Sequence, residues 1–515
     1  MRRLRTPSCI LILTLSFGLT AAGATTLQRP GQTAAPKTDE RKLLDAMHLI
    51  QSGTLLDYVK EMVSEKYGGR LTGTDEYKAC AEWVVSLLKS WGVQPGGENG
   101  TYYQAYPNPY TIVSKGGYLT MDIPVKGDVI KKSYTYEDEF IPGGTSGSGE
   151  IAAEVVFVGY GVTAPELGYD DYAGVDVKGK IVLMNPEVPL RADDSETFRK
   201  WRPYSFHQYK LENAAAHGAK GMIYNYGPIG NPNSSYREGF VYHHVGAAVV
   251  ADVFAGTGKT HAETLAAIRK DLKPRSFATG KTMAMKNITV HHPEGVGFNV
   301  VGVIPGTDPV LKDEVIMLAG HLDHLGRLWE LLPGANDNAT AVAVGLGVAE
   351  AMAKCEIKPK RTIVFAFFGS EEQGVAGSKS YVEHPLFPLD KTLVLINMEG
   401  PGIGDRISAS GATTYPAFWS FIEKANQSYI HRIVSGGGTA YPGRPRQDSA
   451  WFFWAGVPAL TFGADGGKPV PYSTYHNTRD SLDLVTPEIM EDMAQLFFMA
   501  IMDMADEPAL HFRVK

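Results

Sequence analysis

The spacing of apolar residues changes twice along the chain, and each change predicts a different kind of structure. Apolar side chains first recur at steps of three and four residues, which predicts helices over 39–50, 54–69 and 75–93. From about 110 to 260, short runs of β-branched residues alternate with glycine turns around one helical stretch at 209–221. This middle part is typical of a separate β-rich module.

After about residue 285, apolar runs alternate with helical patterns. We expect strands at 314–320, 361–369, 392–397 and 457–463, and helices at 338–354, 414–426 and 486–505. Unbroken apolar strands that alternate with helices favour a mostly parallel sheet covered on both faces. The sequence therefore predicts an α/β fold with a mixed, mostly parallel central sheet flanked by helices, into which the β-rich module is inserted.

Polar side chains capable of binding a metal follow the ends of these predicted strands. In a parallel sheet, ligands bind just beyond the carboxyl ends of the strands, so these residues are expected to converge on one edge. They are His321, Glu371, Glu372, Glu399 and, after a short loop, His476; Asp337 joins them from the start of a helix. Two adjacent carboxylates at 371 and 372 repel one another, which indicates a positive group nearby.

Each of these residues also has an ordinary structural explanation when taken alone. An aspartate at 337, where a helix begins, is a good N-cap, and a glutamate pair is usually a solvated surface feature. A histidine after a strand is often structural, Glu399 would serve as a loop ion-pair partner, and His476 would cap a turn. These separate explanations do not account for all of them falling at one edge of the sheet.

Composition and charge narrow the class of protein. The 515 residues are 44% hydrophobic and 20% charged, as in a globular protein, and the length suggests two or more domains. The start, MRRLRTPSCILILTLSFGLTAAGATT, has a basic beginning, an apolar run too short to span a bilayer and an Ala-Gly-Ala site. We interpret residues 1–24 as a cleaved signal peptide, which predicts a periplasmic or secreted protein without stable membrane insertion.

Removal of residues 1–24 deletes three arginines and no acid, so the formal charge goes from −7 to −10. This acidic balance gives no electrostatic basis for binding nucleic acid. Cys80 and Cys355 remain after cleavage, and the sequence does not decide whether they pair.

The motifs GHLDH, GANDNATA, GSEEQGVAGS, NMEG and YHNTRDSLDLV, in this order, resemble those of zinc peptidase family M28. The segment GGRLTGTDEYKACAEWVVSLLKSWGV also looks like the opening of that family's catalytic domain, and residues 135–265 resemble its inserted protease-associated (PA) domain. The resemblance implies a zinc exopeptidase-like fold. Its catalytic domain would be formed by residues 39–134 and 285–515.

The resemblance also implies two zinc ions and a peptide or small peptide-like substrate. Asp337 would bridge the ions; His321 and Glu399 would complete one site, and Glu372 and His476 the other. Asp323 would orient His321 from outside the ligand set, and His324 has no assigned role.

Under the same resemblance, Glu371 would act as the general base on a zinc-bound water, and Tyr475 would donate to the oxyanion. The family usually has aspartate where this chain has Glu399, which predicts looser or bidentate coordination there.

An exported aminopeptidase is the function expected first. A glutamate-carboxypeptidase-like carboxypeptidase or dipeptidase is the nearest alternative, because Arg444 and Arg446 would suit a substrate carboxylate, although they also fit a solvated loop. A glutaminyl cyclase and a non-catalytic binding homologue are further alternatives. Retention of Glu371 beside Glu372 disfavours a scaffold that has lost catalysis.

Overall fold

The first sheet is built around four adjacent parallel strands, which carry the predicted polar residues at their ends. Its order is β1-β13-β17-β14-β18-β21-β19-β20, with β2 also paired to β13. The bounds are β1 Gln94–Pro95, β2 Tyr103–Pro107, β13 Val296–Ile304, β14 Val315–His321, β17 Thr362–Phe368, β18 Thr392–Met398, β19 Arg406–Ser410, β20 Val434–Gly437 and β21 Ala459–Asp465. Strands β17, β14, β18 and β21 run parallel, whereas β13 and β19 join antiparallel on either side. The predicted mixed, mostly parallel sheet is confirmed.

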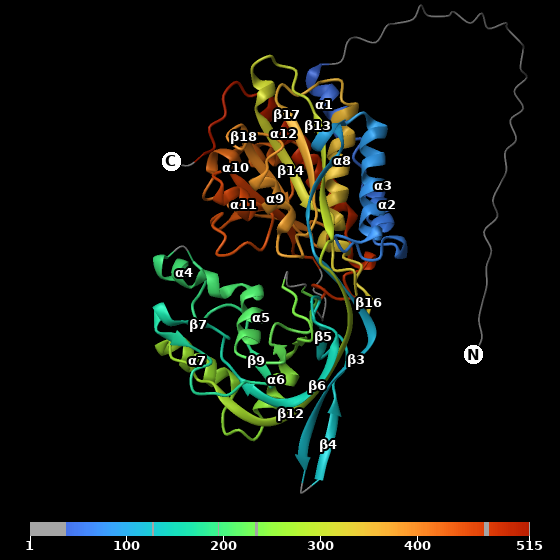
Figure 1. Cartoon of the computed structure of the whole chain (residues 1–515). Coiled ribbons are helices and arrows are strands. Elements are labelled where there is room, and N and C mark those ends of the chain that lie inside the picture. The colour runs from blue at the N-terminus through green and yellow to red at the C-terminus, as the bar shows by residue number, and fades with distance from the viewer. Residues whose placement is uncertain (1–37, 126–127, 194, 232–234, 468–472, 514–515) are drawn as a thin grey trace, which may run out of the picture. The chain divides into compact units, whose positions relative to one another are not determined.

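Helices cover both faces of this sheet, as Figure 1 shows. Their bounds are α1 Asp39–Met47, α2 Ser52–Met62, α3 Asp75–Trp91, α8 Thr340–Lys354, α9 Ala376–Glu383, α10 Pro416–Ala425, α11 Ser449–Trp454 and α12 Pro487–Asp506. Local signals explain the ends of α3: Thr74 accepts a hydrogen bond from the Tyr77 amide at its start, and Gly92 adopts φ 81° at its end. The helices expected over 75–93, 338–354, 414–426 and 486–505 are therefore present.

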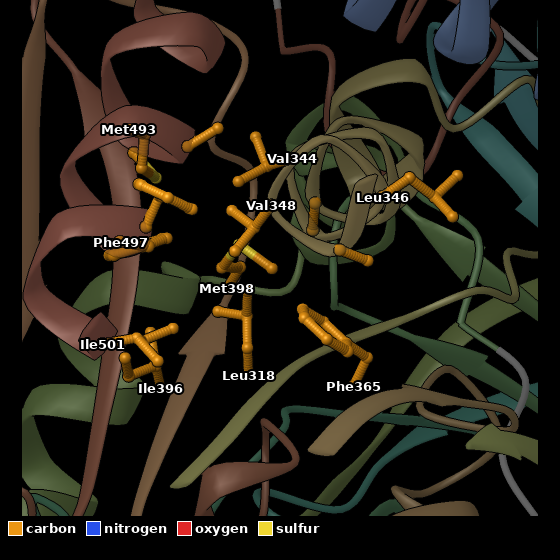
Figure 2. Packing of buried hydrophobic residues seen from close by; sticks show 14 of the residues in the cluster. Leu318, Val344, Leu346, Val348, Phe365, Ile396, Met398, Met493, Phe497 and Ile501 are labelled. Carbon is orange, nitrogen blue, oxygen red and sulfur yellow. The ribbon is translucent and has the colours of Figure 1, made fainter. Parts of the chain in front are cut away.

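Side chains of the central strands alternate between two cores. Leu318 on β14 and Phe365 on β17 belong to one core with residues of α8 and α12, and Figure 2 shows Leu318 near Met398 and Val348. The intervening residues, such as Met317 on β14, pack in a second core with residues of α9 and α11. Because both faces are buried, these strands are apolar at nearly every position, which is why the sequence shows long apolar runs.

A second sheet lies wholly between β2 and β13 except for two short strands, and we call residues 108–295 the insert. Its order is β16-β15-β3-β12-β6-β9-β10-β11-β5, with β4 paired to β3. The bounds are β3 Tyr110–Val125, β4 Asp128–Ser133, β5 Phe140–Pro142, β6 Gly149–Phe157, β9 Ile181–Met184, β10 Gly221–Tyr224, β11 Val241–Val245, β12 Phe277–His292, β15 Arg327–Leu328 and β16 Glu330–Leu331. The insert also holds the hairpin of β7 Thr163–Ala164 and β8 Tyr169–Asp170 and the helices α4 Glu196–Trp201, α5 His207–Ala216, α6 Ala247–Phe254 and α7 His261–Asp271.

The second sheet extends beyond the range 135–265 on both sides. Strand β3 starts at Tyr110 and pairs over ten positions with β12, which ends at His292. The expected range thus leaves β3, β4 and β12 outside the module to which they are hydrogen-bonded. Sequence spacing does not reveal this, because long strands pair with partners distant in the chain.

The insert leaves the first sheet and returns to it at adjacent points. Pro107 pairs with Val296 in the first sheet, and Tyr110 pairs with His292 in the second. Between them, the Asn108 amide donates to the Gly295 carbonyl at 2.7 Å. The two crossings therefore form one short ribbon rather than two independent linkers.

The computed structural model describes residues 38–125, 128–193, 195–231, 235–467 and 473–513, so the predicted signal at 1–24 lies outside it. Residues 39–515 form one compact unit. Within the described residues, the helices are too short or too polar to span a bilayer. Cys80 and Cys355 are buried and unpaired.

Candidate metal centre

Three neighbouring parallel strands deliver the predicted residues to one edge of the first sheet. Strand β14 ends at His321, β17 is followed after two residues by Glu371 and Glu372, and β18 is followed directly by Glu399. Since β17, β14 and β18 are adjacent and parallel, their carboxyl ends meet. The convergence expected from the sequence is a consequence of this register.

One group of ligand atoms forms around His321. Its Nε2 lies 3.3 Å from Asp337 Oδ1 and 3.3 Å from Glu399 Oε2. The His321 side chain is only 1% exposed. Glu399 thus reaches the imidazole as closely as Asp337 does, although it is one methylene longer than the aspartate expected there.

A second group forms around His476. Its Nε2 lies 3.1 Å from Asp337 Oδ2 and 3.0 Å from Glu372 Oε2. Asp337 therefore gives one oxygen to each group. Helix α8 begins at Thr340 with Ala339 in the cap position, so the helix-cap explanation of Asp337 does not apply.

His324 is a member of the centre to which the sequence analysis assigned no role. With Asp337 and Glu372 it offers ligand atoms within 4.8 Å of one another. Its Nδ1 lies 2.7 Å from Glu372 Oε1, yet neither atom makes a hydrogen bond to the described part of the chain. The sequence signal that could have identified His324 was its position three residues after His321, just beyond the end of β14.

The spacing of these atoms fits zinc. Two ligand atoms about 2.0–2.1 Å from a tetrahedral zinc ion are about 3.3–3.4 Å apart. The four contacts of His321 and His476 with carboxylates span 3.0–3.3 Å. Among the described residues, His321 Nε2 and Glu372 Oε1 are buried without a hydrogen-bond partner, as expected of atoms that face a cation.

Mutual electrostatics shift the pKa values of the group strongly. Burial would lower the pKa of His321 and of His476, but facing carboxylates outweigh it and raise both well above the ordinary value. Burial would raise the pKa of Glu372, but His476 and His324 lower it to about 2. The imidazoles thus favour the ionised form of Asp337 and Glu372, the form that binds metal, whereas burial raises the pKa of Glu399.

Glu371 stands outside both groups. Burial, followed by Glu399 and Glu372, raises its pKa well above the ordinary value despite the opposing effect of His321. It lines a cavity of about 90 Å³ together with Glu372, Tyr475 and His476. A carboxyl with a raised pKa beside a cavity is suited to moving protons.

The backbone around the ligands is fastened by buried charged side chains. Asp323 accepts the amides of Glu371 at 3.1 Å and Glu372 at 3.3 Å, and its Oδ1 lies 3.5 Å from His321 Nδ1. Asp480 accepts the amide of Asp337 at 2.9 Å. These contacts hold the two groups in register with each other.

Arg70, from the segment GGRLTGT, fixes two of the ligand loops. It is fully buried and donates to the carbonyls of Leu322 at 2.9 Å and Gly334 at 2.7 Å. Leu322 follows His321, and Gly334 precedes Asp337 by three residues. One guanidinium therefore braces both sides of the first group.

The insert contributes to the wall of the same cavity. His207, Gln208, Tyr226 and Asn231 line it, together with the segment Arg444–Arg446. Tyr475 is 50% exposed, and its ring stacks on His476 with the centroids 3.6 Å apart. The Tyr475 hydroxyl therefore belongs to a side chain at the rim of the centre.

Only one of the two arginines of this segment is exposed. Arg444 is 6% exposed; its Nη2 lies 2.9 Å from Glu187 Oε1 and 3.1 Å from His207 Nε2, both in the insert. Arg446 is 57% exposed and also pairs with Glu187. The solvated-loop explanation therefore does not hold for Arg444, which joins the insert to the first-sheet region.

The sequence profile of peptidase family M28 matches residues 299–501, which contain His321, Asp337, Glu371, Glu372, Glu399 and His476. Residues 299–501 therefore belong to peptidase family M28. The chain is 24% identical over 497 residues to a probable glutamate carboxypeptidase of Arthroderma benhamiae, covering 81% of this chain and 64% of the relative. It is 25% identical over 431 residues to an aminopeptidase of Pseudomonas aeruginosa, covering 80% and 70%.

Among solved structures, the chain is similar to an aminopeptidase from Aneurinibacillus sp. strain AM-1. The TM-score is 0.61 at 20% identity, and the match covers 89% of this chain and 95% of that one. This likeness supports the fold. The chain spans 64% of the length of the carboxypeptidase relative and 24% of the length of a vacuolar membrane protease of Candida albicans.

Proposed function

We propose that this chain is an exported zinc exopeptidase with two metal ions, which releases amino-terminal residues from peptides. The observation that carries the proposal is Asp337, which presents one oxygen to His321 and the other to His476. A shared carboxylate is what two adjacent metal ions require. Export rests on the basic and apolar start of the sequence.

His321 and Glu399 would hold one ion with Asp337, and Glu372 and His476 the other. When bound, the ions would polarise a substrate carbonyl and lower the pKa of water. The 3.3 Å contact of Glu399 with His321 supports glutamate as a ligand in place of the usual aspartate. His324, beside Glu372 Oε1, would hold the second oxygen of that carboxylate.

Glu371 would supply the proton transfers. As a carboxylate it would remove a proton from the attacking water as the new carbon–oxygen bond forms. As a carboxylic acid it would return that proton to the amide nitrogen as the carbon–nitrogen bond breaks. Its position on the cavity beside Glu372 supports this role.

Tyr475 would donate a hydrogen bond to the oxygen that becomes negative in the tetrahedral transition state. Its half-exposed ring against His476 supports that placement. The insert would act as a PA domain that closes one side of the cavity, since four of its residues line it.

The proposal is tested by incubating the mature protein with a mixed peptide pool, with and without a zinc chelator, and identifying products by mass spectrometry. Stepwise loss of amino-terminal residues that stops with chelator is the expected result. Loss from the carboxyl end would replace the aminopeptidase by a carboxypeptidase, with exposed Arg446 as the substrate-carboxylate partner. Cyclised amino-terminal glutamine, or binding without turnover, would overturn the peptidase.

A further inference from the structure

A loop of the insert contacts His476 of the candidate metal centre at two points. The Nδ1 atom of His476 lies 2.6 Å from the Gly230 carbonyl oxygen. In return, the Gly230 amide donates to the His476 carbonyl at 2.8 Å. A carbonyl only accepts hydrogen bonds, so Nδ1 carries a hydrogen and Nε2 is the nitrogen that faces Asp337 and Glu372.

The Gly230 loop is itself held from behind by the insert's sheet. His244, fully buried on β11, has its Nδ1 2.8 Å from the Ile229 carbonyl oxygen. On the opposite side, a Cβ at Gly230 would lie 2.7 Å from Leu328 Cδ1 and 2.9 Å from Leu325 Cδ1. The loop is therefore packed between β11 and the chain that follows His324, with no room for a side chain at position 230.

The turn that carries His476 depends on such support. His476 has φ 57°, in the left-handed region that costs free energy for a residue with a side chain. Two residues on, the amide and hydroxyl of Thr478 each donate to Glu137 of the insert at 2.8 Å. Contacts from the insert thus flank His476 on both sides.

We propose that His244 and the Ile229–Gly230 loop are positioning residues for the second metal site, so that the insert is part of the metal centre. This inference rests on the proposed function, because it requires that His476 bind an ion. Partners outside the ligand set fix the tautomer and orientation of a ligating histidine, and their loss typically weakens metal binding by about 10–100-fold. The loss of metal affinity is expected only at the site formed by His476 and Glu372.

The adjacent residue offers a matched control. His243 lies next to His244 on β11 and is equally buried, but its ring nitrogens have no partner among the described residues. His243→Leu therefore imposes the same change of side chain without touching the loop. His244→Asn is a conservative rescue, because its amide nitrogen stands as many bonds from Cβ as Nδ1 does.

Zinc stoichiometry and affinity of the full mature protein are measured by competition with a chromophoric chelator, and Co²⁺ absorption reports coordination at each site. We expect the parent and His243→Leu to bind two ions tightly. We expect His244→Leu to bind one tightly and the other about 10–100-fold more weakly, and His244→Asn to recover most of the loss. Parental affinity for both ions in folded His244→Leu would overturn the inference.

If His244→Leu does not fold, Glu137→Ala decides the question, since it frees Thr478 from the half-exposed side of the insert. A selective loss of affinity for one ion, of severalfold or more, supports the inference, and unchanged binding overturns it. Failure of the proposed function has a different signature. In that case the parent protein would itself bind fewer than two ions or leave every peptide intact.

Discussion

Two pairs of buried histidines in this molecule respond to burial in opposite ways. At the edge of the first sheet, His321 and His476 have raised pKa values, because the carboxylates around them outweigh burial. On β11 of the insert, burial lowers the pKa of His243 to about 3 and that of His244 to about 4. The side chains are equally enclosed and differ in their counter-charges.

This contrast separates two uses of histidine. Where acids converge, the imidazole belongs to a group of ionised ligands that favours a cation. Where they do not, the ring stays neutral and serves as a fixed donor or as packing. Burial alone therefore does not mark the site, whereas burial together with facing carboxylates does.

The largest expected effect comes from removing the proton carrier of the acidic group. Glu371→Gln should lower kcat by about 10²–10⁴-fold, because the amide cannot accept a proton. The zinc content should remain that of the parent, since Glu371 belongs to neither ligand group. Steady-state kinetics on a peptide from the pool and metal analysis check both, and a kcat within about threefold of the parent would contradict the assigned role.

Loss of the metal ions should come next. Zinc at about 1,000 times its dissociation constant stabilises a folded protein by about 4 kcal/mol, so chelation should lower the melting temperature. Asp337→Ala should abolish this zinc dependence, because Asp337 contributes to both groups. Calorimetric melting with zinc and with chelator tests this. A full zinc response in Asp337→Ala would show that the ions bind elsewhere.

Lowering the pH should destabilise the protein through the second pair of histidines, His243 and His244. Unfolded histidine titrates near pH 6.5, whereas His243 and His244 stay neutral to about pH 3 and about pH 4 in the folded protein. Between these limits the unfolded chain binds more protons, so stability is present above pH 6.5 and is lost as the pH falls.

Acidification from pH 7 to pH 5 should lower the free energy of unfolding by an amount on the order of a few kcal/mol. The His243→Leu substitution should make this decrease smaller. Urea unfolding of the metal-free protein at pH 7 and pH 5 measures the difference. An equal loss in parent and variant would mean that His243 does not contribute to acid sensitivity.

The smallest effect is expected from Glu399→Asp. Shortening the side chain by one carbon–carbon bond of about 1.5 Å withdraws its oxygen from a position 3.3 Å from His321 Nε2. We expect zinc affinity at that site to fall by about tenfold or less, with Glu399→Gln as the control that keeps the length and removes the charge. Tighter zinc binding by Glu399→Asp would show that glutamate is the poorer ligand here.

Much of this could be predicted from the sequence, because it depends on local pattern. The unbroken strands before His321, Glu371 and Glu399 fix their common edge once the strands are parallel. The grouping of Asp337 with both histidines followed from motif order and resemblance. Their roles as zinc ligands remain predictions until metal binding is measured.

Other parts depend on contacts between distant segments and have no local signal. Arg444 pairs with Glu187 of the insert, more than 250 residues away in the chain, rather than facing solvent. The Gly230 carbonyl that contacts His476 is a backbone group. Because every residue has one, the amino-acid sequence gives no signal for this contact. The extent of the second sheet was likewise set by the pairing of β3 with β12.

The ribbon that joins the two sheets has a mechanical consequence. At its narrowest point the Asn108 side-chain amide donates to the Thr72 carbonyl at 3.0 Å and to Gln373 Oε1 at 3.2 Å, and Gln373 is the residue after Glu372. A displacement of Asn108 within this ribbon changes its hydrogen bond to Gln373. The ribbon is thus mechanically coupled to the turn that carries Glu371 and Glu372.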